Sequence, residues 1–211
     1  MILALCCAGL GYGNITWNNA QGNGLWDLTS ANWTSPNGLF TDGARIGFND
    51  TAVGTVTLAG ANVAPASVLF ANSTGNDVTI ASTAAETLTA ADGLEVSGSG
   101  NVTISSSIAG QTAITHRGTG TVSLNGANTS SGGSVVKSGA TLVAGNNAAL
   151  GNAGQATALT VEPGGTLSIG YDTSLNSYGT GSIKMAGAIV KTTGGNFNVF
   201  NGQLDFIGDA S

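Results

Sequence analysis

Short stretches of alternating apolar and polar residues recur along this chain. The pattern is Gly-polar-apolar-polar-apolar, and its clearest copies begin at Gly100, Gly120, Ala140 and Gly165. The first three begin 20 residues apart. The alternation places apolar side chains on one face of a strand and polar side chains on the other. Because Gly, Asn and Ser bound each copy as turn residues, the strands are only about three to five residues long.

A strand this short is stable only when it is stacked on similar strands. Stacking at about 4.8 Å per layer buries the apolar faces in one continuous column and satisfies the backbone polar groups along the stack. The pattern therefore predicts an all-β fold, a right-handed parallel β-helix with two or three strands per coil. An antiparallel β-sandwich is the alternative, since it also has short strands about 8–12 residues apart. The solenoid is preferred because the repeat is visible in the residues as well as in their polarity.

Aromatic residues are concentrated near the start of the chain. Trp17, Trp26 and Trp33 are the three tryptophans, and Phe40 and Phe48 follow them closely. Because a solenoid needs an atypical terminal unit to close its core, we expect residues 14–50 to form an aromatic N-terminal cap. The functional alternative is that the three indole rings form a platform that stacks on sugar rings.

Residues 1–13 form an apolar run followed by small residues, as in the hydrophobic part of a signal peptide. The run has no basic residue before it, and a first strand is the alternative. Cys6 and Cys7 both lie in this run. We therefore expect a signal-peptide remnant at 1–13, the cap at 14–50 and β-helix repeats at 51–211. The last residues resemble no cap, so the repeats are expected to continue in a longer natural polypeptide.

Composition narrows the classes of function. Charged residues make up 8% of the chain and hydrophobic residues 41%, with a net charge of −6 and a mean hydropathy of +0.21. This balance favours a folded chain over a disordered linker. Nucleic-acid binding is not expected, because the five Lys and Arg residues are scattered. No run of about 18 apolar residues occurs, so no transmembrane helix is expected.

The search for chemistry yields no catalytic, cofactor-binding or metal-binding residue, so an enzyme is not predicted. His116 is the only histidine, which excludes a pair of His ligands; we expect it on a strand, facing solvent. Asp42, Arg45 and Asp50 form the densest charged group and are interpreted as turn residues and their neighbour. Glycosidase chemistry needs two carboxylates close together, and only stacking of coils could supply them, for instance from Asp77 and Glu95.

Residues 118–151 carry a resemblance to a known family. They read GTGTVSLNGANT at 118–129, GGSVVKSGATL at 132–142 and NNAALG at 146–151. This run resembles the autotransporter-associated β-strand repeat, with its Gly-x-Gly-x-apolar-x-Leu strand, its Gly-Ala-Asn-Thr turn and its Gly-x-Leu strand. Where the family often has an aromatic residue after Asn-Thr, this chain has Ser130.

The resemblance implies a β-helical passenger exposed on the surface of a bacterium and associated with its outer membrane. Such a segment is adhesive or serves as a rigid stalk, and its expected partners are surface glycans or other cells. The resemblance carries over no catalytic residue and no cofactor. The alternative function is a secreted β-helix that binds or cleaves carbohydrate, with Trp17, Trp26 and Trp33 as its glycan contacts.

Overall fold

The chain folds as a stack of short parallel strands. In the computed structural model, the described residues are 15–146, 148–151, 159–169, 182–191 and 203–206. Every regular element in these ranges is a β-strand, and every pairing between named strands is parallel. The β-solenoid is therefore confirmed, and the antiparallel sandwich is excluded because its sheets would be built from antiparallel neighbours.

Three sheets run along the stack. The first sheet contains, in order, β1 (Ile15–Thr16), β3 (Arg45–Phe48), β5 (Ser67–Phe70), β8 (Leu94–Val96), β11 (Ile114–His116), β13 (Ser134–Val136), β15 (Leu159–Val161), β17 (Ser182–Met185) and β19 (Gln203–Phe206). The second contains β2 (Leu25–Trp26), β4 (Gly54–Leu58), β6 (Val78–Ser82), β9 (Val102–Ile104), β12 (Thr121–Leu124), β14 (Thr141–Ala144), β16 (Thr166–Ile169) and β18 (Ala188–Lys191). The short third sheet pairs β7 (Thr87–Leu88) with β10 (Ser107–Ile108).

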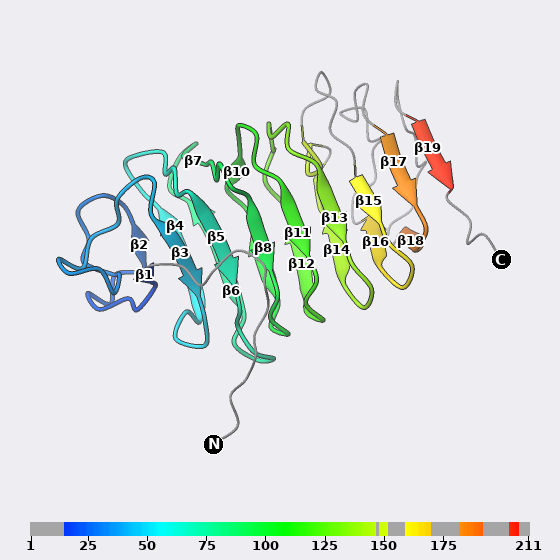
Figure 1. Cartoon of the computed structure of the whole chain (residues 1–211). Helices are drawn as coiled ribbons and strands as arrows, with labels where there is room; N and C mark the ends of the chain where they lie inside the picture. The colour runs from blue at the N-terminus through cyan, green and yellow to red at the C-terminus, as the bar shows by residue number, and fades with distance from the viewer. Residues whose placement is uncertain (1–14, 147, 152–158, 170–181, 192–202, 207–211) are drawn as a thin grey trace.

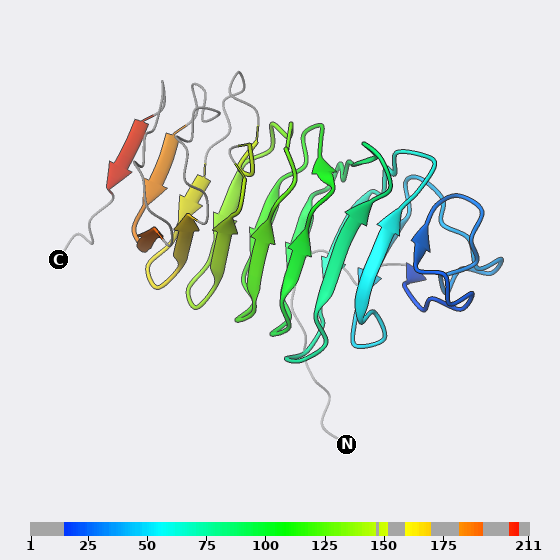
Figure 2. The same cartoon turned by 180° about the vertical axis from the view of Figure 1, so that it is seen from behind.

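The coil is right-handed. In Figure 1 the strands of the first sheet face the viewer and run downward, while the chain advances from blue to red. Seen from behind in Figure 2, the strands of the second sheet run upward. A chain that descends in front and rises behind while it advances to the right in Figure 1 winds as a right-handed helix, the hand that connections between parallel strands almost always take.

Equivalent residues of successive coils stand directly above one another inside the stack. In the second sheet Val102 pairs with Val122 and Val122 with Leu142, which in turn pairs with Leu167. All four side chains are fully buried. Burial of each such aliphatic side chain contributes about 1.5–3 kcal/mol to folding. Residues 20 positions apart in the sequence are thus paired between β9, β12 and β14.

The aromatic residues close the N-terminal end of this core. Trp33 lies edge-on to Trp17 and to Trp26, with ring centroids 5.2 Å apart in both pairs. Phe48 packs on all three tryptophans and stacks on Phe70 of the next coil, at a centroid distance of 4.9 Å. Edge-to-face and stacked rings at these distances interact favourably beyond the area that they bury. The expected aromatic N-terminal cap is confirmed.

Asn32 holds the loop that carries these rings. Its buried side chain donates to the Leu25 carbonyl at 2.9 Å and accepts from the Gln21 backbone amide at 2.9 Å. Beside it, the Thr34 backbone amide donates to the Thr16 carbonyl, and the Thr34 hydroxyl accepts from the Thr16 amide. β1 and β2 are the end strands of the two long sheets as described. The bonds from Asn32 and Thr34 pair backbone groups on the outer edges of these strands, and so cover both edges.

The predicted signal-peptide remnant at 1–13 lies outside the described residues. β1 and β2, within the predicted cap, are already the first strands of the two long sheets. A boundary between cap and repeats at residue 50, with repeats over 51–211, stays a prediction.

Glycines at the corner between the two long sheets permit the close approach of successive coils. A Cβ atom on Gly118 would lie 1.9 Å from the Gly98 carbonyl oxygen, and one on Gly120 would lie 2.1 Å from the Gly100 carbonyl oxygen. Both contacts are with backbone, which can move only if the coil moves. A side chain at either position therefore separates two coils.

We expect Gly120→Ala to lower the free energy of unfolding by at least about 1–3 kcal/mol, the usual cost of overpacking. Thr119→Ala, at the neighbouring exposed position, is the control and should change it by less than about 0.5 kcal/mol. Chemical denaturation followed by circular dichroism measures both. Equal stability of the two variants would contradict the close approach.

We expect Asn32→Ala to destabilise the cap by roughly 1–3 kcal/mol, because the Gln21 amide and the Leu25 carbonyl would lose their hydrogen bonds to the buried Asn32 side chain. Asn37→Ala, in an exposed turn of the same loop, is the matched control and should cost less. Tryptophan fluorescence during thermal unfolding reports the cap directly. Equal melting temperatures of the Asn32→Ala and Asn37→Ala proteins would contradict this role of Asn32.

Candidate functional surface

The charged side chains of the first sheet pair across coils. Arg45 pairs with Asp92, Arg117 with Glu95, and Lys137 with Glu162. Each cation lies in or directly after a strand of this sheet. Between residues 15 and 169, these pairs include every Lys and Arg of the chain. The pairs leave little net charge on this face to attract an ionic ligand.

A second group of carboxylates binds backbone amides of neighbouring coils. Asp42 accepts from the Ala64 amide at 2.7 Å, and Asp77 accepts from the Asn101 amide at 2.9 Å. Asp50 accepts from both the amide and the hydroxyl of Ser73. Glu86 accepts from the Gly60 amide at 3.2 Å. Each bond joins residues 22 to 26 positions apart, so these carboxylates fasten one coil to the next.

These hydrogen bonds stabilise the ionised carboxylates. Bonds from Ser73 lower the pKa of Asp50, and bonds from Asn101 lower the pKa of Asp77. The bonds that Glu86 accepts, first from the Ala84 amide and also from the Thr83 hydroxyl, lower its pKa to about 2. These groups are therefore structural acceptors, ionised at neutral pH, rather than proton donors for catalysis.

The outward face of the second sheet carries no charge in its described part. Its central column consists of Thr55, Thr79, Thr103, Ser123 and Val143, and the column continues to Ser168, which is only 7% exposed. A second column, two residues earlier in each strand, holds Thr121, Thr141 and Thr166. The two sides of the rod thus differ, since one carries paired ions and the other carries uncharged hydroxyl groups.

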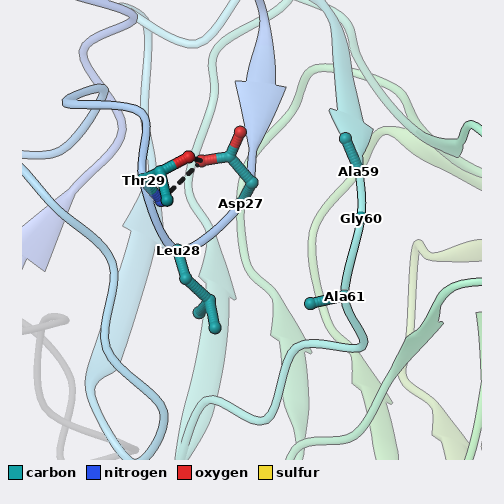
Figure 3. Close-up of a pocket in the computed structure, with 6 residues that line it drawn as sticks. All are labelled: Asp27, Leu28, Thr29, Ala59, Gly60 and Ala61. Atoms are coloured by element: carbon teal, nitrogen blue, oxygen red, sulfur yellow. Dashed lines mark hydrogen bonds between the residues drawn. The ribbon is translucent and has the colours of Figure 1, made fainter.

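A shallow pocket lies beside the cap, with a volume of about 370 Å³. Asp27, Leu28 and Thr29 line one side, and the segment 59–61 lines the other (Figure 3). The Asp27 carboxylate is occupied by its own loop, since it accepts from the Thr29 amide at 2.8 Å and from the Ser30 hydroxyl at 2.9 Å. Partial burial works to raise the pKa of Asp27, but these hydrogen bonds outweigh it and lower that pKa. The pocket is therefore lined by an Asp that stabilises its own turn and by small or apolar residues.

The tryptophans do not form a surface platform. Trp17, Trp26 and Trp33 are 2%, 0% and 1% exposed, because their rings fill the end of the core. Stacking on a sugar requires an exposed ring face, and none of the three offers one in this structure. Their structural role in the cap accounts for their position.

The other candidate residues also have structural partners. Asp42 and Asp50 each bind a residue of the next coil, and Arg45 pairs with Asp92, two coils further along. Asp77 binds Asn101, whereas Glu95 pairs with Arg117, so stacking directs these two carboxylates to separate partners. Among the described residues no three His, Cys, Asp or Glu side chains gather as metal ligands would, and no helix there is long and apolar enough to span a membrane.

The expectation of a solvent-facing His116 is wrong. The side chain is fully buried and lies on the same face of β11 as Ile114, two residues earlier. The expected strand is present, but its alternation sends Thr115 and Arg117 outward and His116 inward.

Comparison with known proteins gives one informative match. The chain is 35% identical, over 187 residues, to a protein named Adhesin BmaC autotransporter from Brucella suis biovar 1 (strain 1330). The match covers 82% of this chain and 5% of the adhesin, so the chain spans a small part of that relative's length. No family model matches the sequence, and no solved structure matches it.

Acidification should weaken the fastening between coils. The pKa values of Asp50, Asp77 and Glu86 lie below those of the unfolded chain, about 3.9 for Asp and 4.3 for Glu. Their contribution to stability is therefore complete above roughly pH 5 and is lost as the pH falls through the folded pKa values. We expect the melting temperature to drop between roughly pH 5 and pH 2, with a shallower drop in Asp77→Asn. Calorimetry across this range measures the effect; parallel curves for the two proteins would contradict it.

Proposed function

The sequence match and the solenoid fit the passenger β-helix of an autotransporter, and on that premise we propose that this chain is a structural, adhesive segment of a bacterial surface protein. It acts as a rigid β-helical stalk in a longer polypeptide. The polypeptide is exported, held at the outer membrane and exposed outside the cell. The segment contacts other cells or surface glycans and is not an enzyme.

The observation that carries this proposal is the continuous ladder. From β3 to β17, each strand of the first sheet pairs with a strand on both sides, and the second sheet is equally continuous from β4 to β16. A rod whose coils are hydrogen-bonded throughout and fastened by side chains resists bending at any single turn. That is the property required of a stalk that projects a binding region.

The adhesive contact is proposed for the uncharged outward face of the second sheet. Hydroxyl groups there can donate to and accept from a neutral partner, such as a glycan, without the cost of desolvating an ion. The first sheet presents ion pairs instead. The two faces can therefore be tested against each other.

The assignment of the adhesive contact to the second sheet is tested by coupling the full chain to beads and measuring their attachment to glycan-bearing host cells. We expect the double substitution Thr103→Glu and Ser123→Glu, at paired positions of the second sheet, to reduce bead attachment at least roughly tenfold, or about 1.4 kcal/mol. The matched control is Thr115→Glu and Val135→Glu, at paired positions of the first sheet. Equal loss in both double variants, or loss in the control alone, would contradict the assignment.

An antiserum against the chain tests the stalk itself. Intact cells, protease-treated cells and culture medium are probed in parallel. A surface species far larger than 20.6 kDa, lost on protease treatment, is the expected result. A free product near 20.6 kDa in the medium would contradict the proposal.

A further inference from the structure

The single histidine of the chain sits in an apolar column in the middle of the rod. In the first sheet His116 pairs in register with Val96 of β8 and with Val136 of β13. The column continues to Phe70 on one side and to Val161 on the other. Every one of these side chains is fully buried. A titratable ring thus occupies a position that neighbouring coils fill with valine or phenylalanine.

In its neutral form the ring makes one hydrogen bond, through Nε2. Its Nε2 atom lies 2.9 Å from the Gly120 carbonyl oxygen, which can only accept, so Nε2 carries the proton. Its Nδ1 atom is buried and has no hydrogen-bond partner within the described residues. A second proton would place a positive charge in an apolar column, which is costly.

The charged groups around this position cannot balance an imidazolium. On the flanking strands and the residues directly after them, Glu95 pairs with Arg117, and Lys137 pairs with Glu162. These side chains point outward, on the opposite face of the sheet. Across the core, β9, β12 and β14 contain no charged residue. Within the described part of the chain, no unpaired carboxylate faces the ring.

We propose that His116 is a pH-sensitive joint, at which mild acidification loosens the coils around β8, β11 and β13 while the cap and the first coils stay closed. The solenoid permits a local response because each coil contacts only its neighbours. Opening of the middle coils exposes the ring to water, where it can accept a proton. A rod that is rigid at neutral pH would thus gain a flexible point in an acidic environment.

The direction of the effect follows from linkage. Burial lowers the pKa of His116 and outweighs the backbone groups of Gly120, Val96 and Thr141, which act to raise it. The folded value then lies below the unfolded value of about 6.5. Such a group contributes stability that is present above the unfolded pKa and is lost as the pH falls below it. The carboxylates of Asp50, Asp77 and Glu86, whose pKa values are lowered, titrate at lower pH than the histidine.

Hydrogen–deuterium exchange of the full chain, corrected for intrinsic exchange rates, tests this at about pH 7.5 and about pH 5.5. We expect protection of β8, β11 and β13 to fall by up to about tenfold, the limit for one proton taken up around a pKa near 6.5. Protection of β4 should not change. In His116→Val, which continues the valine column, and in His116→Gln, which keeps a neutral donor, protection of all four strands should be the same at both pH values.

Two results would overturn the proposal. An equal fall of protection in β4 and in the middle strands would show that acidification acts on the whole rod. A fall that persists in the variants would show that another group is responsible. If His116→Val does not fold, His116→Gln alone decides between these outcomes, because it removes the titration and retains a polar side chain.

Discussion

Backbone hydrogen bonding between successive coils is the interaction on which the rest of this structure depends. In a parallel ladder each strand directs its polar groups toward the coils before and after it, so no strand of two to five residues is stable alone. The stacking also determines the side-chain contacts, because it places residue under residue: Val102 under Val122, Asp77 beside Asn101, Glu95 beside Arg117. The packing of the core, the pattern of the surface and the carboxylates that join the coils therefore all follow from the register of the strands.

The register of the middle coils was readable from the sequence. The 20-residue spacing of Gly100, Gly120 and Ala140 aligns β9, β12 and β14 as the structure pairs them. The information is local, because each copy carries its own alternation and its own turn residues. β16 pairs with β14 despite a spacing of 25 residues, because the additional residues lie between β14 and β15 and leave the register of the next strand unchanged.

The contacts across coils were not readable in the same way. Asp50 and Asp77 reach amides 23 and 24 residues away, and those offsets depend on the length of each intervening turn. For His116 the strand was expected but its face was not: two residues after Ile114, His116 shares the inward face of β11. The clustering of the tryptophans predicted a cap, because the open end of a solenoid core needs large apolar side chains. The sequence left a sugar-binding platform as an alternative, because tryptophan also serves that purpose when its ring is exposed.

Nuclear Overhauser effects between neighbouring strands test the in-register parallel stack most directly. The structure places Ser123 between Thr103 and Val143 on the outward face of the second sheet, and Val122 between Val102 and Leu142 on the inward face. We predict effects from the Ser123 backbone to both Thr103 and Val143, and from the Val122 methyl groups to both Val102 and Leu142. An antiparallel pattern, or contacts on only one side of β12, would contradict the stacked solenoid and every contact derived from it.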